Sequence, residues 1–329
     1  MFRWKAGVFS FAVLLACAPA ASFGQQRAAK DYPSKPIRLV VPFVPGGGGD
    51  FVGRVLGQKI GMTIGQKLFV DNRAGAGGSI GTDVVAKSPP DGYTILVTSS
   101  GHAILPNIMK SLPYDPVKDF TPITLVARSV GFLLVVHPSV PARSVQEFIA
   151  LAKAHPGKLN FGSGGTGSPM HFAGESFNVA AGTQVTHVPY KGVGNAILDF
   201  LSGRIEMSVV SPTDVLTHIR SGRLRALGIS APVRWSKLPD VPTMDESGLK
   251  GYTYATWFGL WFPAGAPTQY VARIRAEVVK ALEDPGTKST FAEQGLDSVG
   301  STPQEFGKTI LEEIDYYHRL AVRIGLTPQ

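Results

Sequence analysis

The sequence has almost no cysteine, and this absence excludes a disulfide-stabilised fold. Its only cysteine is Cys17, which lies in an N-terminal stretch whose composition differs from the rest of the 329 residues. A protein without other cysteines cannot form internal disulfide bonds, so a hydrophobic core has to stabilise it. Once the N-terminal stretch is removed, no cysteine remains to act as a nucleophile.

Catalytic and metal-binding motifs are also missing. The seven histidines show no H-E-x-x-H or other close metal-ligand spacing, and no G-x-S-x-G motif marks a serine nucleophile. An enzyme acting on small acids, such as a hydrolase or an isomerase, would need a nucleophile or base with a positioned partner. The sequence offers no such pair, so we expect no enzymatic activity, no metal and no other cofactor.

Charge is scarce as well. Only 17% of the residues are charged, and the formal net charge is +8. A nucleic-acid-binding protein normally has clustered Lys and Arg with interleaved aromatic residues. The longest basic cluster, residues 220–225, is short. We therefore expect no nucleic-acid partner, and a mildly positive field that attracts small anions fits the composition better.

The first 24 residues have the pattern of a secretory signal peptide. Arg3 and Lys5 precede a short apolar run over residues 7–15, and small residues follow this run. The run is too short to span a membrane, and no later stretch approaches about 18 uninterrupted apolar residues. The sequence thus predicts a soluble, exported protein that resides in the periplasm.

Two forms of the exported protein are possible. Cleavage between Ala20 and Gln26 would release a free periplasmic protein, which is the form that we expect. Residues 14–17 also resemble a lipoprotein cleavage box, so a lipid anchor on Cys17 is the alternative. The leucine at the second position of this box is less usual there.

Predicted strands and helices alternate along most of the remaining chain. Apolar runs bounded by glycine or proline are separated by helical patterns of about 10 to 14 residues. Such alternation is typical of βαβ units, so we predict an α/β fold with mostly parallel sheets flanked by helices. The predicted strands cover residues 36–43, 68–70, 94–97, 132–136, 160–161, 185–188, 205–209 and 226–229.

The last third of the sequence indicates how two domains are connected. Residues 238–244 form an irregular loop, and residues 252–262 are rich in aromatic side chains with an extended pattern. Such a segment could return the chain from a second domain to the first, which would make the first domain discontinuous. Helices are predicted over residues 267–282 and 303–324.

Two helix starts carry the sequence pattern of a capping box. Ser144 is followed by Glu147, and Thr302 is followed by Glu305 with a proline between them at the first helical position. In this motif each side chain accepts a hydrogen bond from a backbone N–H group of the other residue.

Four glycine-rich loops each lie between a predicted strand and a predicted helix. Open α/β sheets bind ligands at the carboxyl ends of their strands, where free N–H groups at helix starts attract anions. Glycine lets a ligand approach the backbone closely. We favour an anion site over the alternative that the loops are only tight turns. The loops cover residues 45–50, 72–79, 99–101 and 162–169.

Nucleotide-binding motifs do not account for these loops. The first loop lacks the Gly-Lys-Ser/Thr ending of a Walker sequence. Residues 162–167 match G-x-G-x-x-G, but the acidic residue expected about 20 positions later is missing and His187 occupies that region.

Single residues near the loops allow both a structural and a binding role. His171 lies in the first turn of a predicted helix, where packing or capping is favoured over ligand contact. Asp50 is favoured as a helix N-cap over a binding acid. Lys191 could pair with a carboxylate or lie on a solvated rim, and Trp257 and Phe258 are favoured as core residues over a ligand stack.

The mature sequence resembles the Bug/TctC-type solute receptors of tripartite tricarboxylate transporters. Each matching segment is weak alone, but their order and spacing are specific. The resemblance extends from residue 32 to the C-terminus. Its segments are residues 32–37, 41–47, 75–78, 114–120, 165–169, 188–192, 240–244 and 263–267.

This resemblance implies a periplasmic binding protein of type II, with two domains that close like a clam over a small ligand. Domain one would comprise residues 30–128 and 254–329, and domain two residues 129–253. Ligands of the family are mostly carboxylates, including dicarboxylates, tricarboxylates and aromatic acids, which backbone amides and water hold. The expected partners of this monomer are the transporter membrane subunits, or alternatively a sensor protein.

The loops and the resemblance together select candidate ligand-binding residues. Four consecutive glycines in the first loop exceed the usual two, which predicts a roomier mouth and leaves the exact ligand open. The candidates are Phe43, Pro45, Gly46, Gly47, Asn72, Gly77, Gly78, Ser99, Ser100, Thr166, Gly167, Ser168, His171, Tyr190, Lys191 and Asp214.

Overall fold

The computed structural model describes residue 1 and residues 32–328, and the chain from Pro33 onward forms one compact unit. The predicted signal peptide and its cleavage site lie outside the described residues. None of the helices in the described part is both long and apolar enough to cross a membrane.

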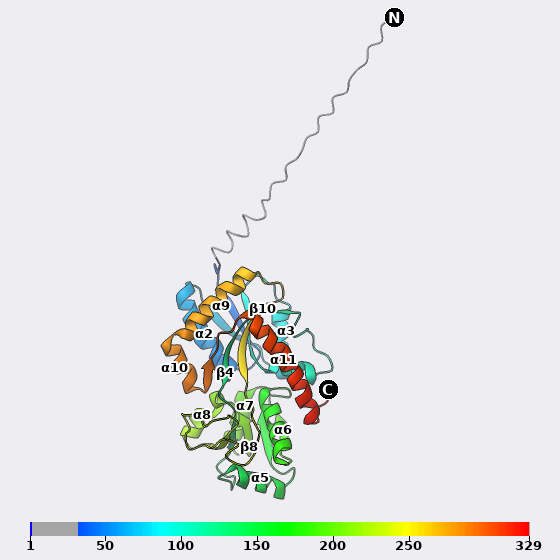
Figure 1. Cartoon of the computed structure of the whole chain (residues 1–329), viewed down its shortest axis with the longest axis vertical. Helices are drawn as coiled ribbons and strands as arrows, with labels where there is room; N and C mark the ends of the chain where they lie inside the picture. The colour runs from blue at the N-terminus through cyan, green and yellow to red at the C-terminus, as the bar shows by residue number, and fades with distance from the viewer. Residues whose placement is uncertain (2–31, 329) are drawn as a thin grey trace. The chain divides into compact units, whose positions relative to one another are not determined.

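A six-stranded sheet forms the centre of the first domain, which is the upper part of the body in Figure 1. Helices α2 and α9 pack against each other, and α11 packs on β4. The strands, in spatial order, are β11 (Leu296–Ser298), β4 (Phe120–Ser129), β10 (Trp257–Pro263), β3 (Thr94–Ser99), β1 (Ile37–Val41) and β2 (Leu68–Asn72). The helices are α2 (Gly48–Ile64), α3 (Ser79–Ala86), α4 (Gly101–Ile104), α9 (Thr268–Glu283), α10 (Pro285–Glu293) and α11 (Pro303–Arg323), with short 3-10 turns η1 (Ala76–Gly78) and η2 (Leu105–Asn107).

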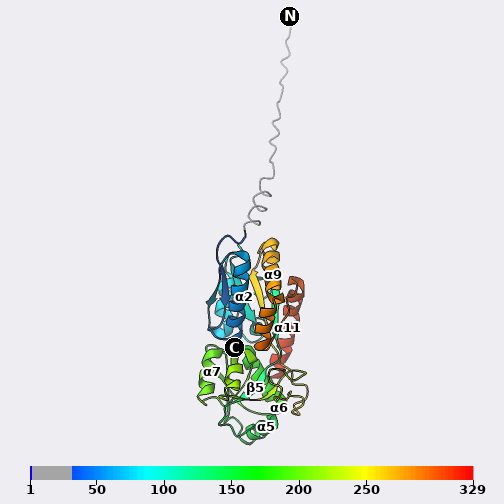
Figure 2. The ribbon, with the colours of Figure 1, turned by 90° about the vertical axis from the view of Figure 1, so that its left-hand side faces the viewer.

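A five-stranded sheet forms the centre of the second domain, drawn in green in Figures 1 and 2. Its strands, in spatial order, are β7 (Thr186–Pro189), β6 (Asn160–Ser163), β8 (Met207–Val210), β5 (Leu133–Val136) and β9 (Arg225–Ile229). Its helices are α5 (Val145–Ala154), α6 (Pro169–Ala181), α7 (Val193–Leu201) and α8 (Pro212–Arg220).

The two α/β domains agree with the sequence, but both sheets are mixed rather than mostly parallel. β1 pairs in parallel with β2 and β3, whereas β10 runs antiparallel to β3 and β4. In the second sheet β5 runs antiparallel to β8 and β9. The reason lies in the connections. A strand that enters a domain from the other domain starts at the edge where the βαβ strands end, so it runs in the opposite direction.

Two neighbouring segments carry the chain between the domains. One links β4 to β5, and the other links β9 to β10, so two stretches of chain build the first sheet. The Ser230 hydroxyl accepts from the Phe132 N–H at 2.8 Å and donates to the Tyr254 carbonyl at 2.6 Å. The Ser129 N–H donates to the Thr256 carbonyl at 2.8 Å, and the Thr256 N–H donates to the Ser129 hydroxyl at 3.0 Å. The exact domain boundaries stay a prediction.

The C-terminal part differs from the sequence prediction in one region. Helices α9 and α11 lie close to the predicted ranges, but the sequence analysis missed α10 and β11. Thr302 and Glu305 form the predicted capping box. Ser144 caps α5, but the Glu147 carboxylate accepts from the Arg143 N–H, so that motif is only half of a capping box.

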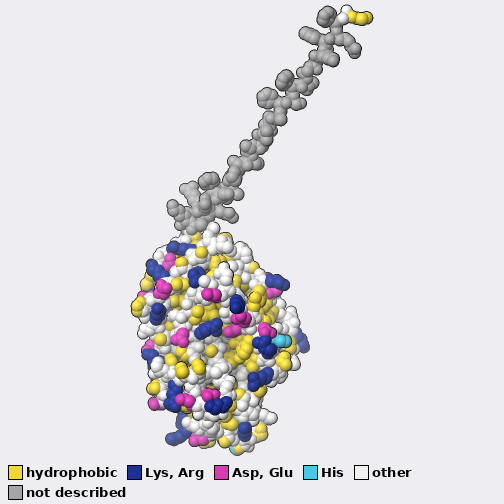
Figure 3. Space-filling view, in the orientation of Figure 1, with side chains coloured by type: hydrophobic (Ala, Val, Ile, Leu, Met, Phe, Trp, Pro, Cys, Tyr) yellow, Lys and Arg dark blue, Asp and Glu magenta, His cyan; other side chains and the backbone are white. Residues whose placement is uncertain are grey.

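The surface offers no extended basic face in the view of Figure 3. Lys and Arg side chains there lie interspersed with Asp and Glu over both domains. Several of these charges pair within their own helix, for example Arg319 with Asp315 on α11 and Arg54 with Asp50 on α2.

Candidate functional site: a cleft between the two domains

A cavity lies where the carboxyl ends of strands from both sheets meet. Its empty space, open mouth included, is about 550 Å³. We call it the inner chamber. It is lined by Phe43, Val44, Gly47, Gly48, Gly49, Ser99, Phe132, Gly164, Ser168, Pro169, Met170, Val193, Ser211, Asp214, Thr256 and Phe258.

A second cavity, the outer chamber, shares Phe43 and Gly164 with the first and contains about 970 Å³ of empty space. Its remaining lining comes from the second and fourth glycine-rich loops, the end of η2 and the loop after β7. These residues are Ala74, Gly75, Ala76, Gly77, Gly78, Ile108, Met109, Gly165, Thr166, Pro189, Tyr190, Lys191 and Gly192.

Four helices begin at the inner chamber. The residues that precede α2, α6, α7 and α8 are Gly47, Ser168, Gly192 and Ser211. A helix start leaves backbone N–H groups without partners inside the helix, and it carries the positive end of the helix dipole. Among the residues described around the inner chamber none is Lys or Arg, and Asp214 is the only charged one. The chamber can therefore bind an anion through backbone donors alone.

The structure corrects the expected role of Asp50. Gly47 is the N-cap of α2, and Asp50 lies in its first turn. The Asp50 carboxylate accepts hydrogen bonds from the Gly46 N–H at 3.1 Å and from Arg54 Nε at 2.9 Å. Burial alone would raise the pKa of Asp50, but these bonds outweigh burial and hold the pKa below its usual value. Asp50 therefore ties the first glycine-rich loop to α2.

Asn72 supports the same loop from the neighbouring strand. Its Nδ2 donates to the Phe43 carbonyl at 2.9 Å, while its side chain lines neither chamber. Ser100 also lies outside the lining of both chambers. It is fully buried, and its hydroxyl is bonded to Thr256 Oγ1 at 2.8 Å.

Close contacts between glycines and the opposite domain bring the walls of the cleft together. A Cβ atom on Gly77 of domain one would lie 2.6 Å from the Thr166 carbonyl oxygen of domain two. A Cβ on Gly192 would lie 2.5 Å from Val44 Cγ2, again across the cleft. These glycines are thus required for the close approach of the two domains, and not only for their turns.

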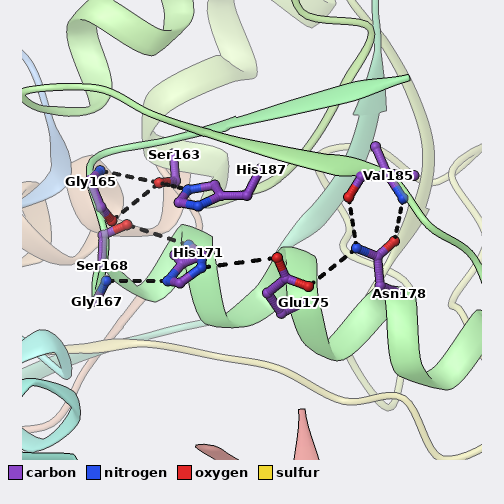
Figure 4. Close-up of polar contacts among 9 residues, drawn as sticks. All are labelled: Ser163, Gly165, Gly167, Ser168, His171, Glu175, Asn178, Val185 and His187. Carbon is purple, nitrogen blue, oxygen red and sulfur yellow. Dashed lines mark hydrogen bonds and ion pairs between the residues drawn. The ribbon is translucent and has the colours of Figure 1, made fainter. Parts of the chain in front are cut away.

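A buried polar network supports the fourth glycine-rich loop from behind, as Figure 4 shows. His171 Nδ1 accepts from the Gly167 N–H at 3.2 Å, and the His171 ring stacks on His187 with centroids 3.9 Å apart. His187 Nε2 shares a 2.6 Å hydrogen bond with the Ser163 hydroxyl, which in turn is bonded to Gly165.

Both histidines of this network are held neutral. Burial lowers the pKa of His171 to about 4. Burial, together with the neighbouring His171, lowers the pKa of His187 to about 3. Because Nδ1 of His171 accepts a hydrogen bond, its proton is on Nε2, which lies 4.0 Å from Oε1 of Glu175. His171 therefore positions the loop and does not line either chamber.

The structure brings most of the predicted candidates to the cleft. Phe43, Gly47, Ser99, Ser168 and Asp214 line the inner chamber. The candidates that line the outer chamber are Phe43, Gly77, Gly78, Thr166, Tyr190 and Lys191. Six candidates line neither chamber, namely Pro45, Gly46, Asn72, Ser100, Gly167 and His171.

Other lining residues escaped the sequence analysis. Phe132 and Thr256 come from the crossover segments, and Ser211 comes from the start of α8. A turn signal was present only at Ser211, which precedes a proline. Trp257 packs on Phe306 in the core as expected, whereas its neighbour Phe258 faces the inner chamber.

Lys191 lies exposed on the rim of the outer chamber. The hydroxyl of its neighbour Tyr190 donates to the Asp199 carboxylate at 2.8 Å, which fixes the ring against α7. Among the described residues, no group of three or more His, Cys, Asp or Glu side chains could hold a metal ion.

Residues 52–326 match the family described as the tripartite tricarboxylate transporter family receptor, TctC. The chain belongs to the TctC family. It is 38% identical over 288 residues to protein BugT of Bordetella pertussis, which covers 87% of this chain and 88% of BugT. TctC proteins are solute-binding proteins, and this chain is a binding protein and not an enzyme.

Solved structures of other proteins support the same family fold. The periplasmic binding protein BugD is 31% identical with a TM-score of 0.87, over 91% of this chain and 100% of BugD. A protein of R. palustris solved with adipate is 32% identical with a TM-score of 0.88, over 91% and 100% of the two chains. MatC of Rhodopseudomonas palustris, solved with malate, is 30% identical with a TM-score of 0.83, and the match covers 88% of this chain and 99% of MatC. The predicted two-domain fold of a type II periplasmic binding protein is confirmed.

Proposed function

We propose that this TctC protein captures a small organic carboxylate in the cleft and delivers it to the membrane subunits of a tripartite tricarboxylate-type transporter. The observation that carries the proposal is the meeting of four helix starts at the inner chamber, whose described lining residues include neither Lys nor Arg. Backbone donors at helix starts bind carboxylates without a basic side chain. The adipate and malate that two related proteins hold support this ligand class.

In this proposal, different parts of the ligand bind in the two chambers. One carboxylate would bind at the starts of α2 and α6 in the inner chamber, and the rest of the ligand would extend past Phe43 into the outer chamber. A second anionic group there lies within the field of Lys191. Because Lys191 is exposed, its contribution is small, and Lys191→Ala should weaken binding by less than about 1 kcal/mol.

A thermal-shift screen of the mature protein with mono-, di- and tricarboxylates and aromatic acids tests the ligand class. A carboxylate at 100 times its dissociation constant should stabilise the folded protein by about 2.7 kcal/mol. Refolding first removes any acid that co-purifies and hides the shift. A response to sugars or cations alone would refute the proposed ligand class.

We further propose that the mature protein is free in the periplasm. Cell fractionation followed by mass spectrometry should find an N-terminus between Ala21 and Arg27. A lipid on Cys17 would instead show that the receptor is anchored.

A further inference from the structure

Among the described residues that line the inner chamber, Asp214 carries the only charged side chain. It lies in the first turn of α8, three residues after the N-cap Ser211. Its Oδ1 atom is buried, and among the described residues this atom has no hydrogen-bond partner. A buried carboxylate oxygen without a partner is unexpected in a chamber whose helix starts favour anions.

The surroundings of Asp214 do not satisfy this oxygen. The N–H of Gly48, at the start of α2 in the opposite domain, faces the carboxyl group. A Cβ on Gly47 would lie 3.8 Å from Oδ1, so the first loop closes over the carboxyl from domain one. The neighbouring hydroxyls of Thr213 and Ser211 are bonded to each other at 2.8 Å. The other chamber walls near it are apolar, including Val44, Val193 and Phe258.

Such a carboxyl lowers the stability of the ligand-free protein. Burial raises the pKa of Asp214 to about 7, because the charged form loses solvation and gains little in return. A buried polar group without a partner is uncommon in folded proteins, and a strongly perturbed acid in a cleft is typical of a functional site. A ligand group that donates a hydrogen bond would satisfy Oδ1.

An unsubstituted dicarboxylate has no such donor. Its carboxylates only accept hydrogen bonds, and a carboxylate at the start of α2 would repel an ionised Asp214. A hydroxyl or amino group on the carbon next to the ligand carboxylate offers a donor at that place. The ligand carboxylate then accepts hydrogen bonds from the helix N–H groups, and the hydroxyl or amino substituent donates a hydrogen bond to Asp214.

Resting on the proposed carboxylate function, we propose that Asp214 accepts a hydrogen bond from the ligand and selects a hydroxy- or amino-substituted carboxylate over its unsubstituted parent. The shared chemistry is a donor group close to a carboxylate. The hydroxy acid and the amino acid differ in the charge of this donor. An ammonium group is attracted by the negative charge of Asp214, whereas a hydroxyl needs only a hydrogen-bond acceptor.

Isothermal titration calorimetry at pH 8 with the full mature protein tests this selection. The ligands are succinate, malate and aspartate, and the longer series glutarate, 2-hydroxyglutarate and glutamate. In at least one series, the hydroxy or amino acid should bind at least tenfold more tightly than its parent. Asp214→Ala should bring this ratio close to one while leaving the parent diacid bound. Asp214→Asn keeps an acceptor, so it should retain the preference for the hydroxy acid and lose a preference for the amino acid.

Asp297→Asn is the matched control, because it removes one exposed acidic charge on β11 outside the cleft and should keep the wild-type ratio. Circular dichroism and the melting temperature show whether each variant is folded. Equal binding of parent and substituted acids by wild type, or an unchanged ratio in Asp214→Ala, overturns the role of Asp214 and leaves the proposed function standing. Tighter binding of the parent at pH 6.5 than at pH 8, with uptake of a proton, also overturns it, because Asp214 then donates. Binding of no carboxylate at all refutes the proposed function, and this inference with it.

Discussion

At the scale of single residues, ionisable groups around the cleft make the stability of the protein depend on pH in opposite directions. Burial raises the pKa of Asp214 from 3.8 to about 7. Between these values the folded state binds more protons than the unfolded state, so this group lowers stability as the pH rises from about 4 to 7. Its contribution is fully unfavourable above about pH 7.

Replacing Asp214 with asparagine should therefore stabilise the ligand-free protein at pH 8. Asparagine keeps the shape but carries no charge, so the expected gain in the free energy of unfolding is about 1–3 kcal/mol. Urea unfolding of wild type and Asp214→Asn at pH 4 and pH 8 measures it. The gain should almost disappear at pH 4, where the wild-type carboxyl is protonated in the folded state; an equal gain at both values would contradict the effect of charge.

His171 and His187 act in the opposite direction. Their pKa values of about 4 and about 3 lie below the ordinary value of 6.5, so the unfolded state binds more protons as the pH falls below 6.5. Each histidine should reduce stability by about 1.4 kcal/mol per pH unit until the pH reaches its own folded-state pKa. His102, whose pKa burial lowers to about 4, adds to this slope from domain one.

Thermal unfolding between pH 6.5 and 4.5 tests the contribution of the stacked pair. His187→Phe keeps an aromatic ring that cannot be protonated. The stability of this variant should therefore fall less steeply with decreasing pH than that of wild type. Ser163→Ala is the matched control, since it removes the hydroxyl partner at 2.6 Å but keeps both imidazoles. It should lower stability at neutral pH and keep the wild-type slope. An unchanged slope in His187→Phe would show that protonation occurs elsewhere.

At the scale of strands and helices, local signals explain why much of the cleft could be predicted. A glycine-rich loop between a strand and a helix is visible in the sequence, so Gly47, Gly77 and Ser168 could be found without the fold. Phe132 and Thr256 could not. They lie more than 120 residues apart and meet only because the two crossover segments run side by side. No local pattern encodes that pairing.

The first loop depends on an element that is distant in sequence. Asn72 at the end of β2 donates to the Phe43 carbonyl at 2.9 Å and so fixes the loop that leads into α2. Asn72→Ala should lower the free energy of unfolding by about 1 kcal/mol and weaken carboxylate binding, because the N–H groups of α2 lose their fixed position. Calorimetry with the ligand from the screen measures the affinity.

Asn178→Ala is the matched control for Asn72→Ala. Asn178 on α6 also holds a backbone carbonyl, that of Val185, at 2.9 Å, but neither residue lines the chambers. This variant should lose stability and keep its affinity for the ligand. An equal loss of affinity in both variants would mean that general destabilisation, and not the position of the first loop, controls binding.

At the scale of the whole molecule, the sequence analysis predicted the direction of several strands incorrectly, and it missed β4 altogether. Alternating strands and helices favour parallel sheets, and β1, β2 and β3 follow that expectation. β10 enters its sheet from the other domain, so it runs antiparallel to both neighbours. Strand direction therefore depends on where the chain changes domains, which composition and periodicity do not reveal.

We expect the two domains to close on a ligand, and such closure requires their backbones to approach each other. Gly77 lies where a Cβ would be 2.6 Å from the Thr166 carbonyl oxygen of the opposite domain. The backbone oxygen cannot rotate away as a side chain could. An alanine at this position can therefore be accommodated only if the domains stay further apart or if the loops move.

Gly77→Ala should consequently hold the cleft partly open. Gly77 has a φ of +65°, so alanine also strains the loop by about 1 kcal/mol. Gly65→Ala is the matched control, because Gly65 has a φ of +68° and nothing within 4 Å of a Cβ. Both variants should lose similar stability, but only Gly77→Ala should bind the ligand more weakly and keep a larger radius of gyration in small-angle scattering at saturating ligand. A ligand drives closure only by binding the closed state more tightly than the open one, so a steric barrier to closure has to lower the affinity. Wild-type affinity and radius in folded Gly77→Ala would exclude closure of the domains at this contact.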